Sequence, residues 1–232
     1  MAKDPSVWKV VGIGCLVLAV FGLLLGVAGG VWVYKSAKRV GDEMRNPDAR
    51  TQKVKEVLGI DELPEGYHAM VAFSIPFVLD IAILSDRAPG SDGMIRDFGE
   101  RGFIYIQFIR AGQDEQDLRD YFEGRTSDPR VLRDNNINID VDEILARGVI
   151  ALDEASLMYV AQRGSVQAQG FTGEGITSVT LIDCPEDKRL RMGVWFAPDP
   201  TPEAAVGEMD LTGTPADEAE LAAFMGRFRY CD

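Results

Sequence analysis

The sequence predicts an α+β protein in which one transmembrane helix precedes a single domain, where an antiparallel β-sheet packs against helices. Three observations predict this fold. Residues 10–33 contain no charged residue and no proline. From residue 69 onward, short runs rich in Ile, Val and Phe are separated by turn-rich segments, which favours antiparallel strands. Amphipathic helical patterns with capping residues lie between and after these runs.

The N-terminal apolar run is long enough to cross a bilayer. A helix of these residues would be about 36 Å long, against a hydrocarbon core of about 30 Å. Trp8 stands at one end, and Trp32 and Tyr34 stand at the other, where aromatic side chains prefer the headgroup layer. We therefore predict an N-terminal tail at residues 1–9 and a membrane helix at residues 10–34, with the lipid bilayer as its partner.

Two other interpretations of this run fit less well. A cleaved signal peptide has an apolar stretch of only about 7 to 15 residues, which ends in a small-residue cleavage site. A lipoprotein would turn polar soon after its lipidated cysteine, whereas the residues after Cys15 stay apolar. We expect a retained signal anchor.

Glycine recurs every fourth residue in the predicted membrane helix, at Gly22, Gly26 and Gly30. This spacing places the three residues on one helical face, where a second helix could approach closely. The alternative is that glycine is simply common in membrane helices. A homodimer through this face is therefore one of two open interpretations.

Membrane orientation does not follow from charge, because basic residues flank both ends of the run. The cysteines add information. Cys184 and Cys231 are the only two outside the membrane run, and an even pair suits a disulfide in an oxidising compartment. Two unrelated thiols of a cytoplasmic domain are the alternative. We expect an extracytoplasmic (periplasmic) domain in a bacterial envelope.

The part of the chain after the membrane run is strongly acidic. Residues 40–232 hold 19 basic and 36 acidic residues, a formal charge of −17. Such a charge disfavours nucleic acid as a partner and is repelled by anionic lipid surfaces. The number of residues suffices for one hydrophobic core. We predict a stalk at residues 35–60 and one soluble domain at residues 61–232.

Local signals place the elements of these two segments. Asn46 can cap a short helix that begins at Pro47 and ends at Gly59. Further helices are predicted at residues 115–123, capped by Asp114, at residues 141–147, and from Pro215, capped by Thr214. Strands are predicted at residues 69–73, 77–84, 103–109, 149–152, 157–162, 165–171, 176–183 and 190–196. Apolar residues fill both alternating sets of the first three, which predicts strands covered on both faces.

Catalytic and metal-binding patterns are weak in this sequence. The single histidine, His68, would have to be the base of any catalytic triad, and no nucleophile motif accompanies it. Residues 170–175 are rich in glycine, but a β-rich segment follows, so a hairpin loop is favoured over a phosphate-binding loop. Oxygen-bearing side chains recur at every second position, as in a calcium loop, at Asp134, Asn136, Asn138, Asp140 and Asp142. An EF-hand needs Gly where Ile139 stands and Glu where Leu145 stands, so a turn that caps a helix is the preferred interpretation.

These patterns predict a membrane-anchored, non-catalytic binding or assembly domain with a protein partner or a second copy of itself. We expect no cofactor. One alternative is a domain that binds a small molecule or a lipid within curved strands. Another is a hydrolase that works with carboxylates alone, because close acidic pairs are nearly inevitable in so acidic a domain.

Overall fold

The computed structural model describes residues 46–75, 78–90, 99–109, 114–134, 139–168, 171–185, 187 and 189–231. The chain divides into two units, Met1–Glu43 and Met44–Asp232, and every described residue belongs to the second. The predicted tail, membrane helix, aromatic flanks and glycine face therefore lie outside the described residues. No helix within the described ranges is long and apolar enough to cross a bilayer.

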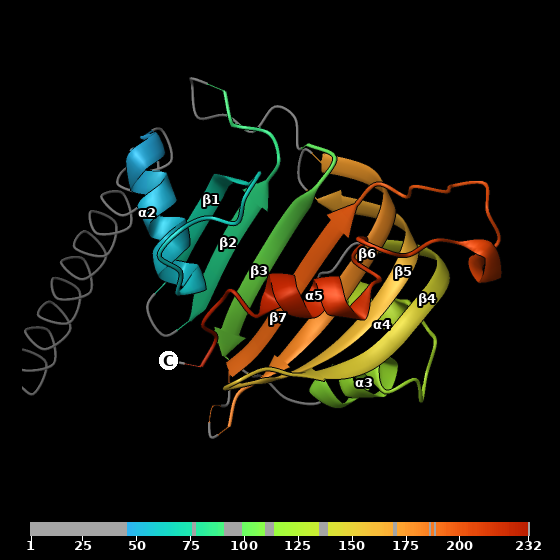
Figure 1. The fold of residues 1–232 in the computed structure, drawn as a ribbon. Coiled ribbons are helices and arrows are strands. Elements are labelled where there is room, and N and C mark those ends of the chain that lie inside the picture. The colour runs from blue at the N-terminus through green and yellow to red at the C-terminus, as the bar shows by residue number, and fades with distance from the viewer. Residues whose placement is uncertain are drawn as a thin grey trace, which may run out of the picture. The chain divides into compact units, whose positions relative to one another are not determined.

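The described residues form one antiparallel sheet of seven strands with a few helices, which confirms the α+β prediction (Figure 1). The strand order is β1-β2-β3-β7-β6-β5-β4. The strands are β1 (His68–Ile75), β2 (Leu79–Ser85), β3 (Gly102–Ile109), β4 (Ile139–Ala151), β5 (Ser156–Ala168), β6 (Phe171–Asp183) and β7 (Arg189–Ala197). The helices are α2 (Pro47–Leu58), α3 (Asp114–Phe122), α4 (Arg130–Asp134) and α5 (Glu218–Met225), with a 3₁₀ turn, η1, at Val206–Glu208.

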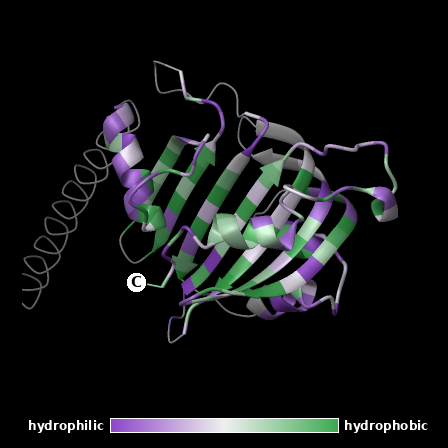
Figure 2. Ribbon diagram, viewed as in Figure 1, coloured by the Kyte–Doolittle hydropathy of each residue, from purple (hydrophilic) through white to green (hydrophobic). Residues whose placement is uncertain are grey.

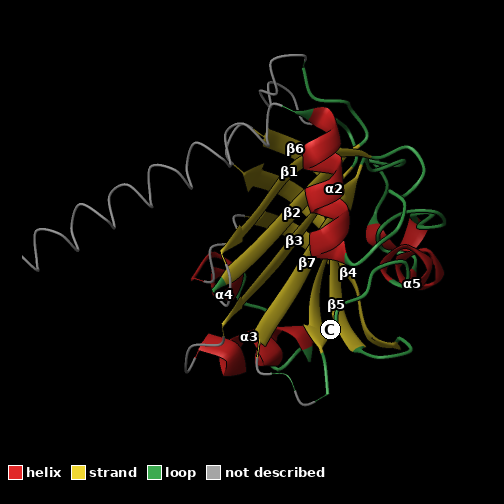
Figure 3. Ribbon diagram, turned by 90° about the vertical axis from the view of Figure 1, so that its left-hand side faces the viewer, coloured by secondary structure: helices red, strands yellow, loops and turns green. Residues whose placement is uncertain are grey.

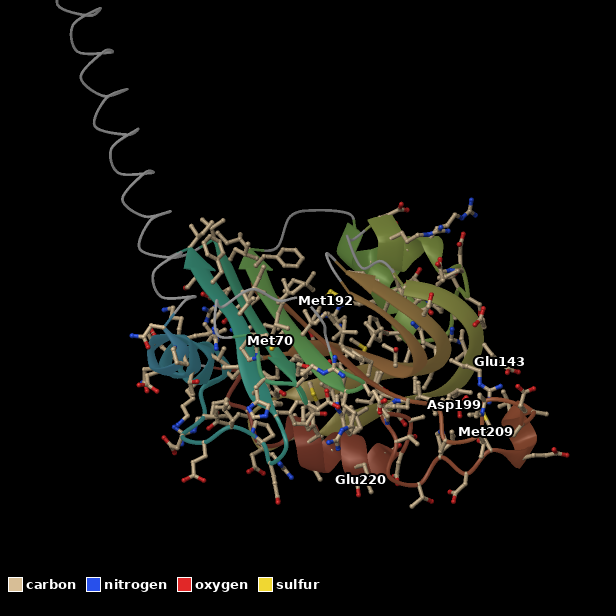
Figure 4. The ribbon with its side chains drawn as sticks, turned by 90° about the horizontal axis from the view of Figure 1, so that it is seen from above. Met70, Glu143, Met192, Asp199, Met209 and Glu220 are labelled. Carbon is tan, nitrogen blue, oxygen red and sulfur yellow. A yellow bond between two sulfur atoms is a disulfide. The ribbon has the colours of Figure 1, made fainter. Side chains whose placement is uncertain are left out.

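Helices lie on both sides of the sheet (Figure 3). On one side, α2, α5 and the C-terminal segment cover a core in which Phe224 stacks on Trp195, with ring centroids 4.4 Å apart. On the other side, α3 and α4 cover a second core through Leu118, Tyr121 and Leu132. Met192 of β7 and Glu220 of α5 lie on opposite sides of the sheet in Figure 4.

The helix α2 begins and ends where the sequence predicts. The Asn46 side chain accepts hydrogen bonds from the backbone N–H groups of Asp48 and Ala49, and Gly59 ends the helix with a positive φ of 63°. Val54 and Leu58 are buried in the first core. The Arg50 Nε donates to the carbonyl of Ala69 at 2.9 Å, beside a register shift in β1, so α2 is fixed to the first strand.

The predicted helix at residues 141–147 is wrong, because these residues belong to β4. Two register shifts, between Val141 and Glu143 and between Ile144 and Ala146, interrupt the two-residue alternation that identifies a strand. The spacing of Asp140 and Glu143 imitates a capping box. Pairing with β5 along the length of the strand overrides that local signal.

Three smaller boundaries also differ from the prediction. The segments 157–162 and 165–171 were expected as separate strands, but β5 continues from Ser156 to Ala168. Ala168 pairs with Phe171, so most of the glycine-rich stretch lies within β6 rather than in the hairpin loop. The final helix begins after Asp217, whose side chain caps it, instead of after Thr214.

Candidate binding surface

Three rows of apolar side chains cross strands β1, β2 and β3 on one side of the sheet. Residues that lie directly opposite one another in neighbouring antiparallel strands project from the same face. The pairing defines the rows Val71–Ile83–Ile104, Phe73–Ile81–Ile106 and Ile75–Leu79–Phe108. We call these nine residues the β1–β3 apolar face; Figure 2 shows hydrophobic residues along the same strands.

The two sides of these strands differ in burial. Ala82, Leu84 and Phe103, which point toward α2 and α5, are fully buried. Of the nine residues of the β1–β3 apolar face, eight are half-buried and Ile75 is 36% exposed. Ile104 and Phe108 touch the second core, whereas the other seven belong to neither core cluster of the described residues.

The reason lies in where α3 and α4 pack. Their buried residues share a cluster with residues of β5, β6 and β7, such as Val160, Leu181 and Met192. The same apolar rows continue from β3 into β7, because Ile106 pairs with Met192. One continuous apolar sheet face is therefore buried over β5–β7 and left half-open over β1–β3 by the described helices. In Figure 4, side chains drawn in carbon alone project from β1–β3 on the side away from α5.

The described residues leave one prediction open. The sequence pattern predicted that the first strands are covered on both faces, but no described element buries the β1–β3 apolar face fully. Apolar residues at both alternating positions indicate that a strand needs cover on both sides. They do not tell whether the cover comes from the same domain.

On the α2 side, the same strands carry a small polar cluster. The Asp80 carboxylate accepts hydrogen bonds from the Ser74 hydroxyl and, at 2.9 Å, from the Gln107 side-chain amide. The Tyr105 hydroxyl donates to Gln107 at 3.1 Å, and burial raises the pKa of Tyr105 to about 12. The adjoining hollow of about 160 Å³ is smaller than typical ligand sites. We interpret this cluster as structural, since its polar side chains form hydrogen bonds with one another.

Two larger hollows are polar at their walls. One of about 640 Å³ lies between β4, β5 and the segment after β7, and it includes Arg163, whose Nε lies 2.8 Å from an Asp199 oxygen. Figure 4 shows Glu143, Asp199 and Met209 close together at this edge of the sheet. The other, of about 530 Å³, adjoins the C-terminal segment and contains Asp153, Glu154 and Arg227. Neither provides the apolar cavity that a lipid-binding site would need.

The predicted calcium residues do not come together as a ligand set in the described structure. Asp134 ends α4, and Asp140 and Asp142 lie in β4. Asn136 and Asn138 lie outside the described residues. In the described ranges, no three His, Cys, Asp or Glu side chains are grouped so that they could hold a metal ion.

The carboxyl groups give little support to hydrolytic chemistry. A general acid needs a raised carboxyl pKa. Hydrogen bonds from Arg130 lower the pKa of Asp128 to about 2, and hydrogen bonds from Arg189 lower that of Asp187 further. A hydrogen bond from Arg125 also lowers the pKa of Asp120, and hydrogen bonds from Thr212 lower the pKa of Asp210. His68 is exposed at the first position of β1.

Cys184 and Cys231 form a disulfide, with Cα atoms 5.4 Å apart. The bond joins the end of β6 to the C-terminal segment. The neighbouring Tyr230 is buried and donates its hydroxyl to the Met225 carbonyl at 2.8 Å. The C-terminal segment is thus held on the sheet by a covalent bond and by a buried aromatic side chain.

The fold and this surface define a class in general terms: an antiparallel α+β domain with a half-open apolar sheet face. The chain matches no protein-family model, and it matches no curated protein.

Proposed function

We propose that this chain is a membrane-anchored, non-catalytic binding domain that engages a protein partner through the β1–β3 apolar face. The observation that carries the proposal is the set of three apolar rows, which the described helices leave half-open. Contiguous apolar surface of this kind on a soluble domain is characteristic of interaction sites.

The size of the face is consistent with a binding role. Burying a Val, Leu, Ile or Phe side chain completely contributes about 1.5 to 3 kcal/mol. Most of the surface of the eight half-buried residues is already buried, so completing the burial of one contributes about 0.5 kcal/mol. Nine such residues offer several kcal/mol. That is of the order of the cost of association, so a modest affinity would require a partner that fits closely.

Charge favours a protein over an anionic lipid surface as the partner. The formal charge of −17 on residues 40–232 opposes both anionic lipids and a second copy of the domain. A protein with an apolar patch and a basic rim would complement this domain. The domain would act outside the cytoplasm, in the bacterial envelope, since its disulfide suits an oxidising compartment. The anchor would be residues 10–34.

Photo-crosslinking in intact cells tests the proposal. A photoreactive amino acid at Ile106, in the middle row, should give an adduct with another protein. The matched control is Val149, which is 63% exposed on β4, at the opposite edge of the sheet. It should give no such adduct. Adding Ile81→Asp beside Ile106 should abolish the adduct, because a carboxylate would have to be buried without a partner.

The outcomes separate the alternatives. An adduct between two differently tagged copies would identify the partner as a second copy of this chain. Equal adducts at Ile106 and Val149, or an adduct that survives Ile81→Asp, would contradict a specific site on this face. A lipid adduct alone at Ile106 would contradict the protein partner.

A further inference from the structure

Three exposed apolar side chains gather at one end of the first three strands. Ile75 ends β1, Val78 directly precedes β2 and Ile109 ends β3, with 36%, 51% and 56% of their surfaces exposed. The Val78 N–H donates to the Ile75 carbonyl at 2.9 Å, and the Ile109 N–H donates to the Val78 carbonyl at 3.3 Å. We call these three residues the apolar tip.

Two charged side chains that the structure describes near the tip have partners within the domain. Arg189 lies opposite Ile109 in the ladder between β3 and β7, and its guanidinium pairs with Asp187. The Asp80 carboxylate, near the start of β2, accepts hydrogen bonds on the α2 side of the sheet. Among the described residues at this end of the sheet, Arg189 and Asp80 are therefore held by contacts within the domain.

The chain between the predicted anchor and α2 is long enough to bring the tip to the membrane. Arg50, near the start of α2, contacts Ala69, near the start of β1. Gly59, which follows α2, and Ser74, near the end of β1, line one hollow. Asn46 is thus separated from the tip by about the length of β1, roughly 27 Å for eight residues. Residues 35–45 can span roughly 40 Å when extended, which exceeds that distance.

We propose that the apolar tip inserts into the boundary between headgroups and acyl chains of the bilayer that holds the anchor of the same chain; this rests on the anchor of the proposed function. Aliphatic side chains at the end of a hairpin suit that boundary, because they can leave water without burying a charge. The anchor holds the tip at an effective concentration on the order of millimolar, so weak insertion suffices. The β1–β3 apolar face then stands beside the membrane, within reach of another membrane protein.

Spin-label accessibility in vesicles tests this arrangement. The full chain is reconstituted in phosphatidylcholine, and single nitroxides are placed at Val78→Cys or Val149→Cys in a Cys15→Ala background, in which the disulfide stays intact. Oxygen partitions into lipid, whereas a nickel chelate stays in water. The ratio of oxygen to nickel collisions should be several-fold higher at Val78 than at Val149, although both native side chains are exposed.

A nitroxide on the native Cys15 separates the tip from the anchor. Oxygen-rich collisions at both Cys15 and Val78 support the proposal. Oxygen-rich collisions at Cys15 with nickel-rich collisions at Val78 overturn the tip and leave the anchor standing. Nickel-rich collisions at Cys15 overturn the anchor, and the tip proposal with it. Protection of Val78 from both reagents places protein there instead of lipid, and it also overturns the proposed insertion of the tip.

Adding phosphatidylglycerol should lower the ratio of oxygen to nickel collisions at Val78, because the domain is acidic.

Discussion

At the residue scale, one carboxylate, that of Asp187, pairs with two arginines of β7. The Asp187 carboxylate accepts from Arg189 Nε at 2.8 Å and also pairs with Arg191, which is fully buried. Hydrogen bonds from Arg189 hold the pKa of Asp187 far below its ordinary value, and Arg191 adds to this effect against the opposing effect of burial. A buried guanidinium without its counter-ion is strongly destabilising.

We therefore predict that Asp187→Asn lowers the free energy of unfolding by about 3 kcal/mol at neutral pH. Because the folded pKa of Asp187 lies below its unfolded value of about 3.8, its stabilisation is present above about pH 4 and declines as the pH falls further. Urea unfolding of the full chain in detergent micelles should show a gap between wild type and variant at pH 7. The gap should narrow at pH 3.

The matched control is Asp128→Asn, because Asp128 pairs with Arg130 at the surface. It should leave the urea midpoint at pH 7 almost unchanged. A gap between wild type and Asp187→Asn that is the same at pH 7 and pH 3 would contradict the assigned role of the carboxylate.

At the element scale, the structure shows which segments local signals can specify. The cap, first-turn proline and terminal glycine of α2 are all contained within the helix and its two neighbours, so the sequence predicts its bounds. β4 is different, because its two register shifts have meaning only against β5. The same limit applies to the β1–β3 apolar face. The strands were predictable from their residues, but the absence of a described helix over them depends on where α3 and α4 pack.

The close approach of β4 to β5 gives an element-scale prediction. A Cβ on Gly164 of β5 would lie 2.0 Å from the Asp140 carbonyl oxygen of β4. Since that oxygen belongs to the backbone, the two strands would have to move apart. Gly164→Ala should therefore lower the free energy of unfolding by about 2 kcal/mol or more.

Gly207 in the turn η1 provides the control, because no heavy atom beyond Gly207 and its two chain neighbours lies within 4 Å of a Cβ placed there. Gly207→Ala should change the urea midpoint only slightly. Equal effects of the two substitutions would show that the tight contact between β4 and β5 does not constrain the fold.

At the scale of the whole molecule, the disulfide connects stability with compartment. The bond closes a loop across 47 residues of sequence separation. The double substitution Cys184→Ser/Cys231→Ser should cost about 2 to 5 kcal/mol of unfolding free energy, measured by urea titration of the full chain in micelles.

The redox state of the cysteines tests the compartment directly. When native membranes are alkylated before reduction, mass spectrometry should find Cys184 and Cys231 unmodified. Alkylation of both cysteines would indicate a reducing compartment and contradict the extracytoplasmic assignment.

The candidate site was only partly predictable from the sequence, because it depends on how the strands pair. From the weakness of its catalytic patterns, the sequence predicted a binding role, which stays a proposal, and it predicted apolar strands on both alternating sets. It could not show that Val71, Ile83 and Ile104 form one row, since the row exists only once β1, β2 and β3 pair in register. Exposure at the apolar tip likewise depends on which strand ends meet.

The most direct test of the central claim, that the β1–β3 apolar face is covered by a partner, is cysteine protection at Ile106. Native membranes are first prepared so that a membrane-impermeant maleimide reaches the extracytoplasmic side. In these membranes, Ile106→Cys in a Cys15→Ala background should react slowly with the maleimide. It should react faster once the chain is purified in detergent. Val149→Cys should react at the same fast rate in both. An Ile106→Cys that reacts as quickly in native membranes as in the purified chain would contradict the claim.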